Sequence, residues 1–477
     1  MFKKLSVSLA VIFISTSTFG QALSTTDVKV FDWWFYTRHY PDLMKAGINT
    51  EPRARDHWLQ HGIKEGRQAK NNFNVRDYLN IHPDLVAAFG QNNYTQALTH
   101  YLTFGFKEGR RTIKANTSFS FTENENLYIG NENFMLRAGS SFAGSFDSLV
   151  YKDTEIINNH DSGRLLQTAV SFDGLGECNN PTEGGRQGEM TKGSSVLVSK
   201  NLTNSFINTK VQAANWLSKG QTSVYCGNGK TSVEPVLSDT FIEKTATIGF
   251  NNDPNIIKYD VTVTNPIDHK IMQVEALTGY HQPILNHVYE MNFEDGQTIE
   301  KKFISLDGEG GDLFQNLKPA ILASADQQIA IGTVALDFSN YENSQQKSEM
   351  VNNVVPRYMQ FAHLVSNEKN DPTTKWSIVF THPDAHAGKY HYQIFVVLGN
   401  LTEVKAKLYL LIQNNKKDIL GKLLKSDIGE KTFDAHYYAD RYPDLYKYAQ
   451  YNEKLLLDHY LVFGFNEARE AGALFNG

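Results

Sequence analysis

A dense group of polar side chains occurs within a region of otherwise apolar segments. It contains His160, Arg164, Glu177 and Glu183, which are interspersed with glycines. Histidine and glutamate exchange protons readily, and arginine stabilises developing negative charge, so these residue types suit general acid–base chemistry. If the protein is catalytic, we expect His160 to act as the acid, Glu177 or Glu183 as the base, and Arg164 to neutralise charge.

The same residues also have a structural interpretation. Arg164 can pair with Asp161 or Glu183 and brace a loop, because a buried brace and a ligand clamp use the same atoms. Other nearby side chains offer the donors and acceptors that sugar hydroxyls need, and aromatic rings such as Trp216 offer a face for a pyranose. The predicted ligand-binding residues are Asp161, Gln167, Asp173, Asn179, Asn180, Tyr280 and Trp376.

Two further clusters carry atoms that could ligate metals. Zinc ligands are available in His382, Asp384, His386 and His391, but their spacing fits no established motif and a solvated hairpin loop is favoured. Calcium ligands are available in residues 307–312, but an acidic turn is favoured because the spacing departs from that of an EF-hand. We therefore expect neither a metal ion nor a cofactor.

The first 22 residues have the pattern of a secretory signal peptide. Lys3 and Lys4 precede an apolar run, residues 5–14, and Ala22 provides a cleavage position. The run is shorter than the ~20 residues that span a bilayer. We expect a periplasmic or secreted protein without a membrane span.

In such an oxidising compartment, Cys178 and Cys226 are predicted to form a disulfide worth roughly 3 to 4 kcal/mol, with two buried free thiols as the alternative.

Three segments repeat one pattern, which predicts a repeated structural unit. Each begins with an aromatic residue before Asp or Asn, continues to Pro-Asp-Leu, and ends with a histidine ten residues before an arginine. The segments are 31–67, 73–110 and 433–469.

We expect each repeat to form two short helices. The Pro-Asp pair interrupts the first helix, and Gly62, Gly105 or Gly464 ends the second in a left-handed conformation. An ion pair between Asp42 and Arg67 is expected to tie the helices together, and a ligand site built from the repeated histidines is the alternative.

The region between the repeats favours strands. Residues 260–264 alternate polar and apolar side chains, and 328–336, 376–380 and 391–398 are rich in β-branched and aromatic residues. Residues 403–412 are ambiguous between helix and strand. These patterns predict a mainly β protein, a large antiparallel sandwich with small α-helical repeats at both ends. The predicted segments are 1–22 (signal peptide), 23–115 (two repeats), 117–430 (sandwich) and 431–477 (third repeat).

Part of the sequence resembles exported bacterial proteins of the galactose-mutarotase-like supersandwich class. The resemblance covers most of residues 125–412, and the segments that carry it are 160–167, 172–177, 180–183, 276–280 and 395–401. It implies a broad, curved antiparallel sandwich whose concave face handles carbohydrate. Members of this class include epimerases, lyase and hydrolase domains, and domains that only bind. The helical units resemble repeats appended to many exported bacterial proteins.

Three functions follow as hypotheses. The first is a secreted protein that binds a sugar or polysaccharide without turnover. The second is a sugar-active enzyme, namely an epimerase, glycoside hydrolase or polysaccharide lyase. The third is a cell-envelope protein that binds a partner through its repeats. A net charge of -6 provides no cationic surface for nucleic acid, so nucleic acid is not expected as a partner.

Overall fold

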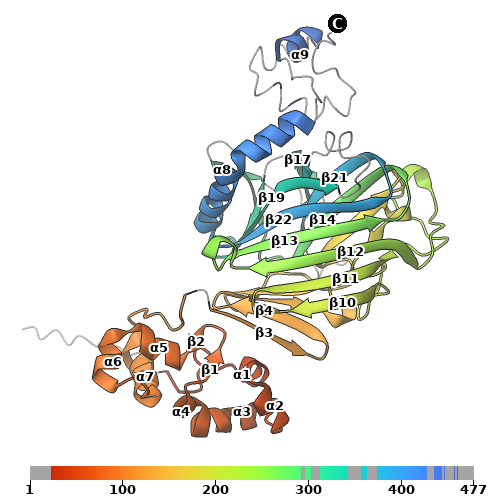
Figure 1. Cartoon of the computed structure of the whole chain (residues 1–477). Coiled ribbons are helices and arrows are strands. Elements are labelled where there is room, and N and C mark those ends of the chain that lie inside the picture. Colours follow the sequence, from red (N-terminus) through yellow and green to blue (C-terminus); the bar gives the residue numbers. More distant parts are fainter. Residues whose placement is uncertain are drawn as a thin grey trace, which may run out of the picture. The chain divides into compact units, whose positions relative to one another are not determined.

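The computed structural model divides the chain near Lys114 into two compact units, which we describe separately (Figure 1). The predicted signal peptide, the predicted calcium ligands 307–311 and most of the third repeat lie outside the described residues. The structure describes residues 23–115, 117–291, 296–301, 312–316, 319–341, 356–361, 373–426 and 435–442, together with 445, 456 and 459.

The N-terminal unit contains two copies of the predicted helical repeat. Asp32 and Asn74 cap the first helix of their copies by accepting hydrogen bonds from backbone N–H groups. A proline begins the next helix, so the Pro-Asp pair interrupts the first helix as predicted. The first copy comprises α1 (Trp33–His39), α2 (Pro41–Lys45), α3 (Glu51–His57), the π-helical segment η1 (Trp58–Gly62), α4 (Ile63–Glu65) and β1 (Gln68–Lys70). The second comprises β2 (Phe73–Asn74), α5 (Val75–Ile81), α6 (Pro83–Phe89), α7 (Tyr94–His100) and the π-helical segment η2 (Tyr101–Gly105).

A tyrosine–histidine hydrogen bond joins the two halves of each repeat. The Tyr36 hydroxyl lies 2.9 Å from His57 Nδ1, and the Tyr78 hydroxyl lies 2.8 Å from His100 Nδ1. Both tyrosines are buried in one aromatic core with other rings of the unit. The repeated histidines therefore have a structural partner within each repeat.

The predicted glycine caps are wrong by four residues. Gly62 and Gly105 are the last residues of the π-helical segments η1 and η2. An added Cβ at Gly62 would overlap the hydroxyl of Tyr36, and one at Gly105 would overlap that of Tyr78. The left-handed residues are instead Gly66 (φ 65°) and Gly109 (φ 64°). Gly62 and Gly105 therefore make room for a buried tyrosine instead of ending a helix.

The predicted aspartate–arginine pairs are confirmed in both N-terminal copies. Arg67 lies 2.8 Å from Asp42, and Arg110 lies 2.6 Å from Asp84. Part of the third copy is described as α9 (Ala435–Arg441), where the Tyr438 hydroxyl lies 3.1 Å from His459 Nδ1. The same tyrosine–histidine contact thus occurs in all three repeats.

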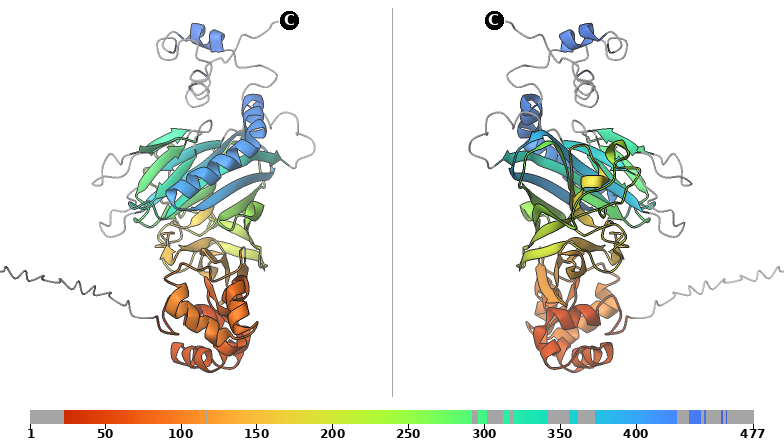
Figure 2. Two further views of the ribbon diagram at one scale, coloured as in Figure 1. Left: turned by 90° about the vertical axis from the view of Figure 1, so that its left-hand side faces the viewer. Right: turned by 90° about the vertical axis from the view of Figure 1, so that its right-hand side faces the viewer.

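The second unit is built around two antiparallel layers (Figures 1 and 2). In order of pairing, the first layer contains β10 (Val196–Leu202), β11 (Phe206–Asn215), β12 (Leu237–Ile248), β13 (Ile256–Asn265), β22 (Gly388–Gly399), β19 (Ala330–Tyr341), β18 (Ala320–Ala323), β15 (His287–Met291) and β16 (Thr298–Lys301). The second contains β17 (Asp312–Asn316), β20 (Pro356–Phe361), β21 (Thr374–Ala385), β14 (His269–His281), β8 (Leu166–Phe172), β6 (Phe146–Tyr151), β5 (Phe134–Ala138), β4 (Asn126–Asn131) and β3 (Ser118–Glu123).

Two short strands complete the sandwich. β7 (Thr154–Glu155) pairs with β6, and β9 (Pro181–Thr182) pairs with both β8 and β11, so it joins the layers. Alternate residues of the central strands face an apolar core between the layers; β13, for example, contributes Tyr259, Val261 and Val263. The predicted mainly β, antiparallel class is confirmed.

A helix covers part of the first layer on the side away from this core (Figure 2). α8 (Leu401–Ser426) contacts β18, β19 and β22 through buried residues that include Val404 and Leu408. An added Cβ at Gly332 of β19 would overlap both side chains, so the glycine permits close approach. The ambiguous residues 403–412 are therefore helical.

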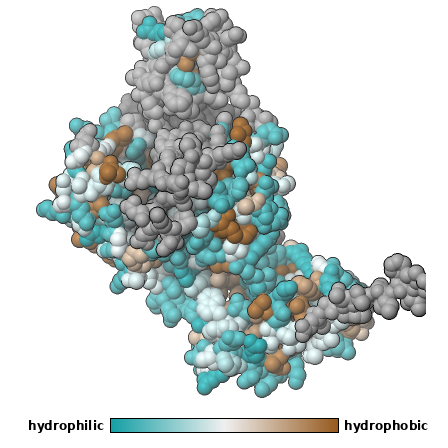
Figure 3. All heavy atoms as spheres, turned by 180° about the vertical axis from the view of Figure 1, so that it is seen from behind, coloured by the Kyte–Doolittle hydropathy of each residue, from teal (hydrophilic) through white to brown (hydrophobic). Residues whose placement is uncertain are grey.

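Among the described residues, no helix is both long and apolar enough to cross a membrane. Figure 3 shows one side of the molecule, where the described surface is largely hydrophilic and the hydrophobic residues form small, separate patches. Such patches are ordinary on proteins in water.

Candidate functional site

Polar side chains gather on the face of the second layer that points away from the core. In β14, Met272 and Val274 face the core, and Glu275 therefore faces outward. A bulge after Glu275 shifts the register, so that Thr278 pairs with Ser377 and Tyr280 pairs with Lys375 of β21. Two central strands thus place complementary polar groups side by side.

These groups form a hydrogen-bonded ion-pair network. The Ser377 hydroxyl donates to Glu275 Oε2 at 2.7 Å and lies 2.9 Å from the Thr278 hydroxyl. Lys375 Nζ lies 3.4 Å from Glu275 Oε2 and 5.0 Å from the centroid of the Tyr280 ring. The side chains of Glu275 and Lys375 retain 29% and 14% of their exposure, so the pair is partly open to solvent.

The network sets the charge state of its members. Burial alone would raise the pKa of Glu275, but the Lys375 charge and the Ser377 hydrogen bond hold that pKa below its usual value. Burial would lower the pKa of Lys375, yet the charge of Glu275 raises it above its usual value. Both groups are therefore ionised at neutral pH.

A second carboxylate reaches the network from the 3₁₀ turn η4 (Glu177–Asn179). The pKa of Glu177 is raised above its usual value, mainly by burial and also by the charge of Glu275. A hydrogen bond with Ser223 and the charge of Lys375 lower this pKa but do not offset the burial. The charge of Glu177 therefore interacts with both members of the ion pair. The Glu177 N–H donates to the carbonyl of Tyr225 at 3.3 Å, and the Tyr225 side chain is 58% exposed beside it.

The predicted disulfide fixes this turn and is confirmed. Cys178 and Cys226 are joined with a Cα–Cα distance of 5.1 Å. Gly176 adopts φ 53°, and a Cβ at this position would overlap the Tyr225 carbonyl oxygen, so the position favours glycine. The disulfide and Gly176 together hold Glu177 and Tyr225 next to each other.

The loop before β8 supplies Asp161 and Arg164. Asp161 Oδ1 accepts hydrogen bonds from Gly163 N at 2.9 Å and Arg164 N at 3.0 Å, and Arg164 Nε lies 3.5 Å from Asp161 Oδ2. The predicted structural brace between these two side chains is therefore present. The Asp161 charge also contributes to raising the pKa of Tyr280, after burial as the main cause, so this loop lies near the network.

His160 and Gly163 extend the contacts of this loop. His160 N donates to Asn158 Oδ1 at 3.1 Å, and its side chain is partly exposed. An added Cβ at Gly163 would overlap the ring of Trp216, so that aromatic candidate packs directly against the loop.

Glu183 lies apart from this group, inside the sandwich. Neither Glu183 nor its partner Lys244 of β12 has any exposed side-chain surface, and the two form an ion pair. Glu183 Oε2 also accepts a hydrogen bond from Thr168 N at 3.0 Å. A buried, ion-paired carboxylate can reach a ligand only if the pair opens. The burial of Glu183 therefore does not support its predicted role as a base.

The other predicted binding residues fall into three environments. Gln167 is buried and bonds to the backbone of Gly163 and Gly184, and Trp376 is fully buried against His281 with no exposed ring face. Asp173 lies 2.9 Å from His269 on the exposed rim. Asn179 is the last residue of η4 and Asn180 follows it, and both are partly exposed. Of this predicted set, Tyr280, Asp161 and Gln167, the strand partner of Thr278, lie near the Glu275 network, and Asn179 and Asn180 lie in or next to η4.

The predicted zinc candidates take separate partners. His382 is buried with Nε2 2.7 Å from the Tyr392 hydroxyl, His386 lies 3.2 Å from Asp268, and His391 lies 3.7 Å from Asp260. Residues 381–385 belong to β21, so the predicted solvated loop is wrong for that stretch because strand pairing with β14 continues through it. Within the described ranges, no three metal-ligating side chains form a cluster.

Sequence reasoning missed Glu275 and Lys375, the central pair of the site. Each occupies an alternate position in an apolar strand, which is a weak signal on its own. Their contact depends on pairing between strands about one hundred residues apart, and nothing in the local sequence indicates it.

No protein-family model and no curated protein sequence matches this chain. Among solved structures, similarity is found to a heparan sulfate lyase from Pedobacter heparinus, with a TM-score of 0.29 and 10% identity over 75% of this chain and 47% of the lyase. A 4-alpha-glucanotransferase from Thermococcus litoralis matches with a TM-score of 0.29 and 9% identity over 77% of this chain and 49% of that protein.

An alpha-galactosidase from Geobacillus stearothermophilus matches with a TM-score of 0.29 and 8% identity over 61% of this chain and 42% of that protein. The chain thus spans about half the length of each of these three structures or less. At these scores the matches assign neither a family nor an activity to this chain.

Proposed function

We propose that the outer face of β14 and β21 binds a saccharide. The proposal rests chiefly on the partly exposed Glu275–Lys375 pair, which is held by Ser377 and lies beside the Tyr280 ring. Sugars are recognised by fixed charged and hydroxyl-bearing side chains that hydrogen-bond to their hydroxyls, and by aromatic rings that contact their C–H faces. Tyr225, beside Glu177, supplies an exposed ring.

The fixed positions of these groups favour binding. Strand pairing sets the spacing of Glu275 and Lys375, and the disulfide holds the turn that carries Glu177 and Tyr225. A saccharide meeting such a surface does not have to order the side chains, which lowers the entropic cost of association.

Affinity electrophoresis in gels that contain plant, algal or bacterial polysaccharides tests the proposal. We expect at least one polysaccharide to retard the full chain, and Glu275→Gln or Lys375→Met to weaken retardation at least tenfold, since each change breaks a charged hydrogen-bonding pair. Glu243→Gln is the matched control, because Glu243 is exposed on β12 of the other layer. Equal retardation of Glu275→Gln and the unaltered chain would place the binding surface elsewhere.

Turnover of the bound sugar is the second candidate function. The environment raises the pKa of Glu177 and lowers that of Glu275, and a pair of carboxyl groups separated in this way suits an acid and a base. In hydrolysis, Glu177 would give its proton to the glycosidic oxygen as the C1–O bond breaks. Water would add to C1, and Glu275 would accept the proton that the water loses.

Reducing-sugar release from the retarding polysaccharide separates the two candidates. A hydrolase predicts that Glu177→Gln abolishes release while retardation persists. If the protein only binds, the unaltered chain releases no reducing sugar from the polysaccharide.

We further propose that the protein works in an oxidising compartment outside the cytoplasm, which the Cys178–Cys226 disulfide supports.

A further inference from the structure

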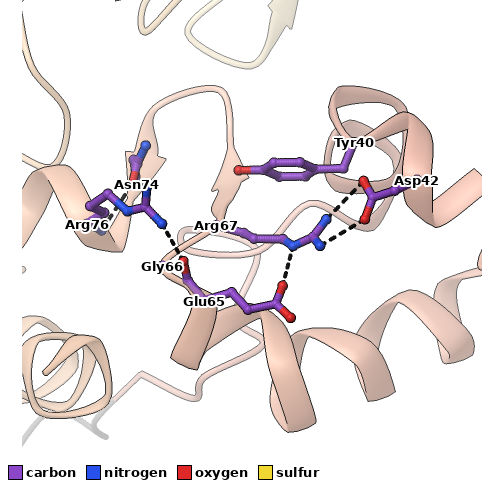
Figure 4. Close-up of a pocket in the computed structure, with 7 residues that line it drawn as sticks. All are labelled: Tyr40, Asp42, Glu65, Gly66, Arg67, Asn74 and Arg76. Atoms are coloured by element: carbon purple, nitrogen blue, oxygen red, sulfur yellow. Dashed lines mark hydrogen bonds and ion pairs between the residues drawn. The ribbon is translucent and has the colours of Figure 1, made fainter. Parts of the chain in front are cut away.

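A cavity of about 510 Å³ lies in the N-terminal unit, where the first repeat meets the second (Figure 4). Tyr40, Asp42, Glu65 and Arg67 line it from the first repeat, and Asn74 and Arg76 line it from the second. Its volume falls within the range of roughly 300 to 1,000 Å³ that is typical of small-molecule sites.

The two acidic residues of the cavity are already engaged. Arg67 contacts Asp42 at 2.8 Å and Glu65 at 2.5 Å, and its guanidinium lies over the Tyr40 ring at 4.7 Å from the centroid. Figure 4 shows Arg67 placed between these carboxylates below the ring. Both carboxylates of the cavity are therefore ion-paired with Arg67.

Three side chains that line the same cavity can still donate hydrogen bonds. The Tyr40 hydroxyl accepts from Gln68 N at 2.6 Å, which leaves its own O–H to donate. Asn74 Oδ1 accepts from the N–H groups of Arg76 and Asp77, which leaves its amide NH₂ to donate. Arg76 Nη2 donates to the Glu65 carbonyl at 2.5 Å, which leaves Nε and Nη1.

Arg76 also has no carboxylate partner among the described residues. Its guanidinium lies 5.6 Å from the centroid of the Tyr94 ring, and its charge lowers the pKa of Tyr40, a smaller effect than the burial that raises it. The other repeats carry Trp34 and His436 at this position. The helical unit therefore does not require an arginine here.

We propose that this cavity binds the carboxylate group of a small acidic ligand. A carboxylate only accepts hydrogen bonds, and the hydroxyl, the amide and the guanidinium that line the cavity can each donate one. Either an acidic sugar or a peptide C-terminus would supply such a group. The cavity belongs to the N-terminal unit, whereas the saccharide face proposed above belongs to the second unit.

Isothermal titration of the full chain carrying Glu275→Gln tests the proposal without a contribution from the saccharide face. The probes are sodium glucuronate as the acidic sugar, N-acetylalanine as the peptide terminus, and glucose as the neutral control. We expect one or both carboxylates to bind with 1:1 stoichiometry and glucose not to bind. Binding of glucose as tight as that of glucuronate, or no binding of either acid, would overturn the proposal.

Two variants locate the site. Arg76→Leu is expected to weaken carboxylate binding at least tenfold, whereas Arg53→Leu, on an exposed arginine outside the cavity, leaves binding unchanged. Asn74→Asp keeps the helix cap, since the other repeats carry Asp32 and Asp434 there, but replaces a donor with a like charge. It is expected to weaken binding as much as Arg76→Leu without lowering the melting temperature. Unchanged affinity in both Arg76→Leu and Asn74→Asp would contradict the assignment.

Discussion

At the scale of single residues, the first repeat requires glycine at position 62, because there is no room for a side chain. We predict that Gly62→Ala destabilises the first repeat by about 1 to 3 kcal/mol, because the new methyl group overlaps the buried Tyr36 hydroxyl. The measurement is hydrogen exchange by mass spectrometry on peptides from 51–67 of the full chain, where protection should fall. Gln60→Ala, at an exposed position of the same π-helical segment, is the control and should change little.

A second substitution checks the cause. Adding Tyr36→Phe to Gly62→Ala removes the overlapping oxygen and should recover part of the lost protection, although the bond to His57 is lost. Additive losses would show that the methyl group clashes elsewhere. The repeat pattern makes Gly62 visible in the sequence, but the reason for the glycine is a contact with a tyrosine 26 residues earlier, and helix-capping rules point to the wrong role.

At the scale of elements, one interior ion pair links strands of both layers. Lys244 of β12 meets Glu183, which follows β9 and bonds to β8, and neither side chain is exposed. We predict that Lys244→Met or Glu183→Gln alone costs about 3 to 5 kcal/mol, because each leaves an uncompensated partner in the core. The double variant should cost less than the sum of the two, as measured by urea unfolding. Lys200→Met, which breaks the exposed Lys200–Glu125 pair, should cost below about 1 kcal/mol.

Elements with strong periodicity were predictable, and elements defined by distant partners were not. The alternation in 260–264 and the β-branched runs identify β13, β19, β21 and β22 because these strands bury one face. Residues 403–412 stayed ambiguous, since their apolar residues contact the outside of a layer whose position the sequence does not reveal. The polar motif around His160 was predictable as a conspicuous loop, but the pairing of Glu275 with Lys375 required the sheet register.

At the scale of the whole molecule, buried neutral histidines make stability depend on pH. Burial lowers the pKa of His281 and His382 to about 3, below the unfolded value near 6.5. The unfolded state therefore binds more protons, and the free energy of unfolding falls as the pH drops from about 6.5 toward 3. Each histidine contributes a slope of about 1.4 kcal/mol per pH unit in this window.

Urea unfolding between pH 7 and pH 4.5 measures this dependence. His382→Phe should reduce the slope by one proton, and so should His281→Leu. His287→Leu alters an exposed histidine paired with Glu300 and serves as the matched control. A flat profile for the unaltered protein across this interval would refute the burial of these two rings as neutral groups.

The order of strands also has a consequence for synthesis on the ribosome. β22 lies between β13 and β19, and β21 lies between β14 and β20, so the last two strands of the sandwich complete the middle of both layers. A nascent chain that ends before Thr374 leaves β13 and β14 without neighbours on one side. The sandwich can therefore close only when nearly four hundred residues have been made, and until then its incomplete layers expose backbone groups that other chains can pair with.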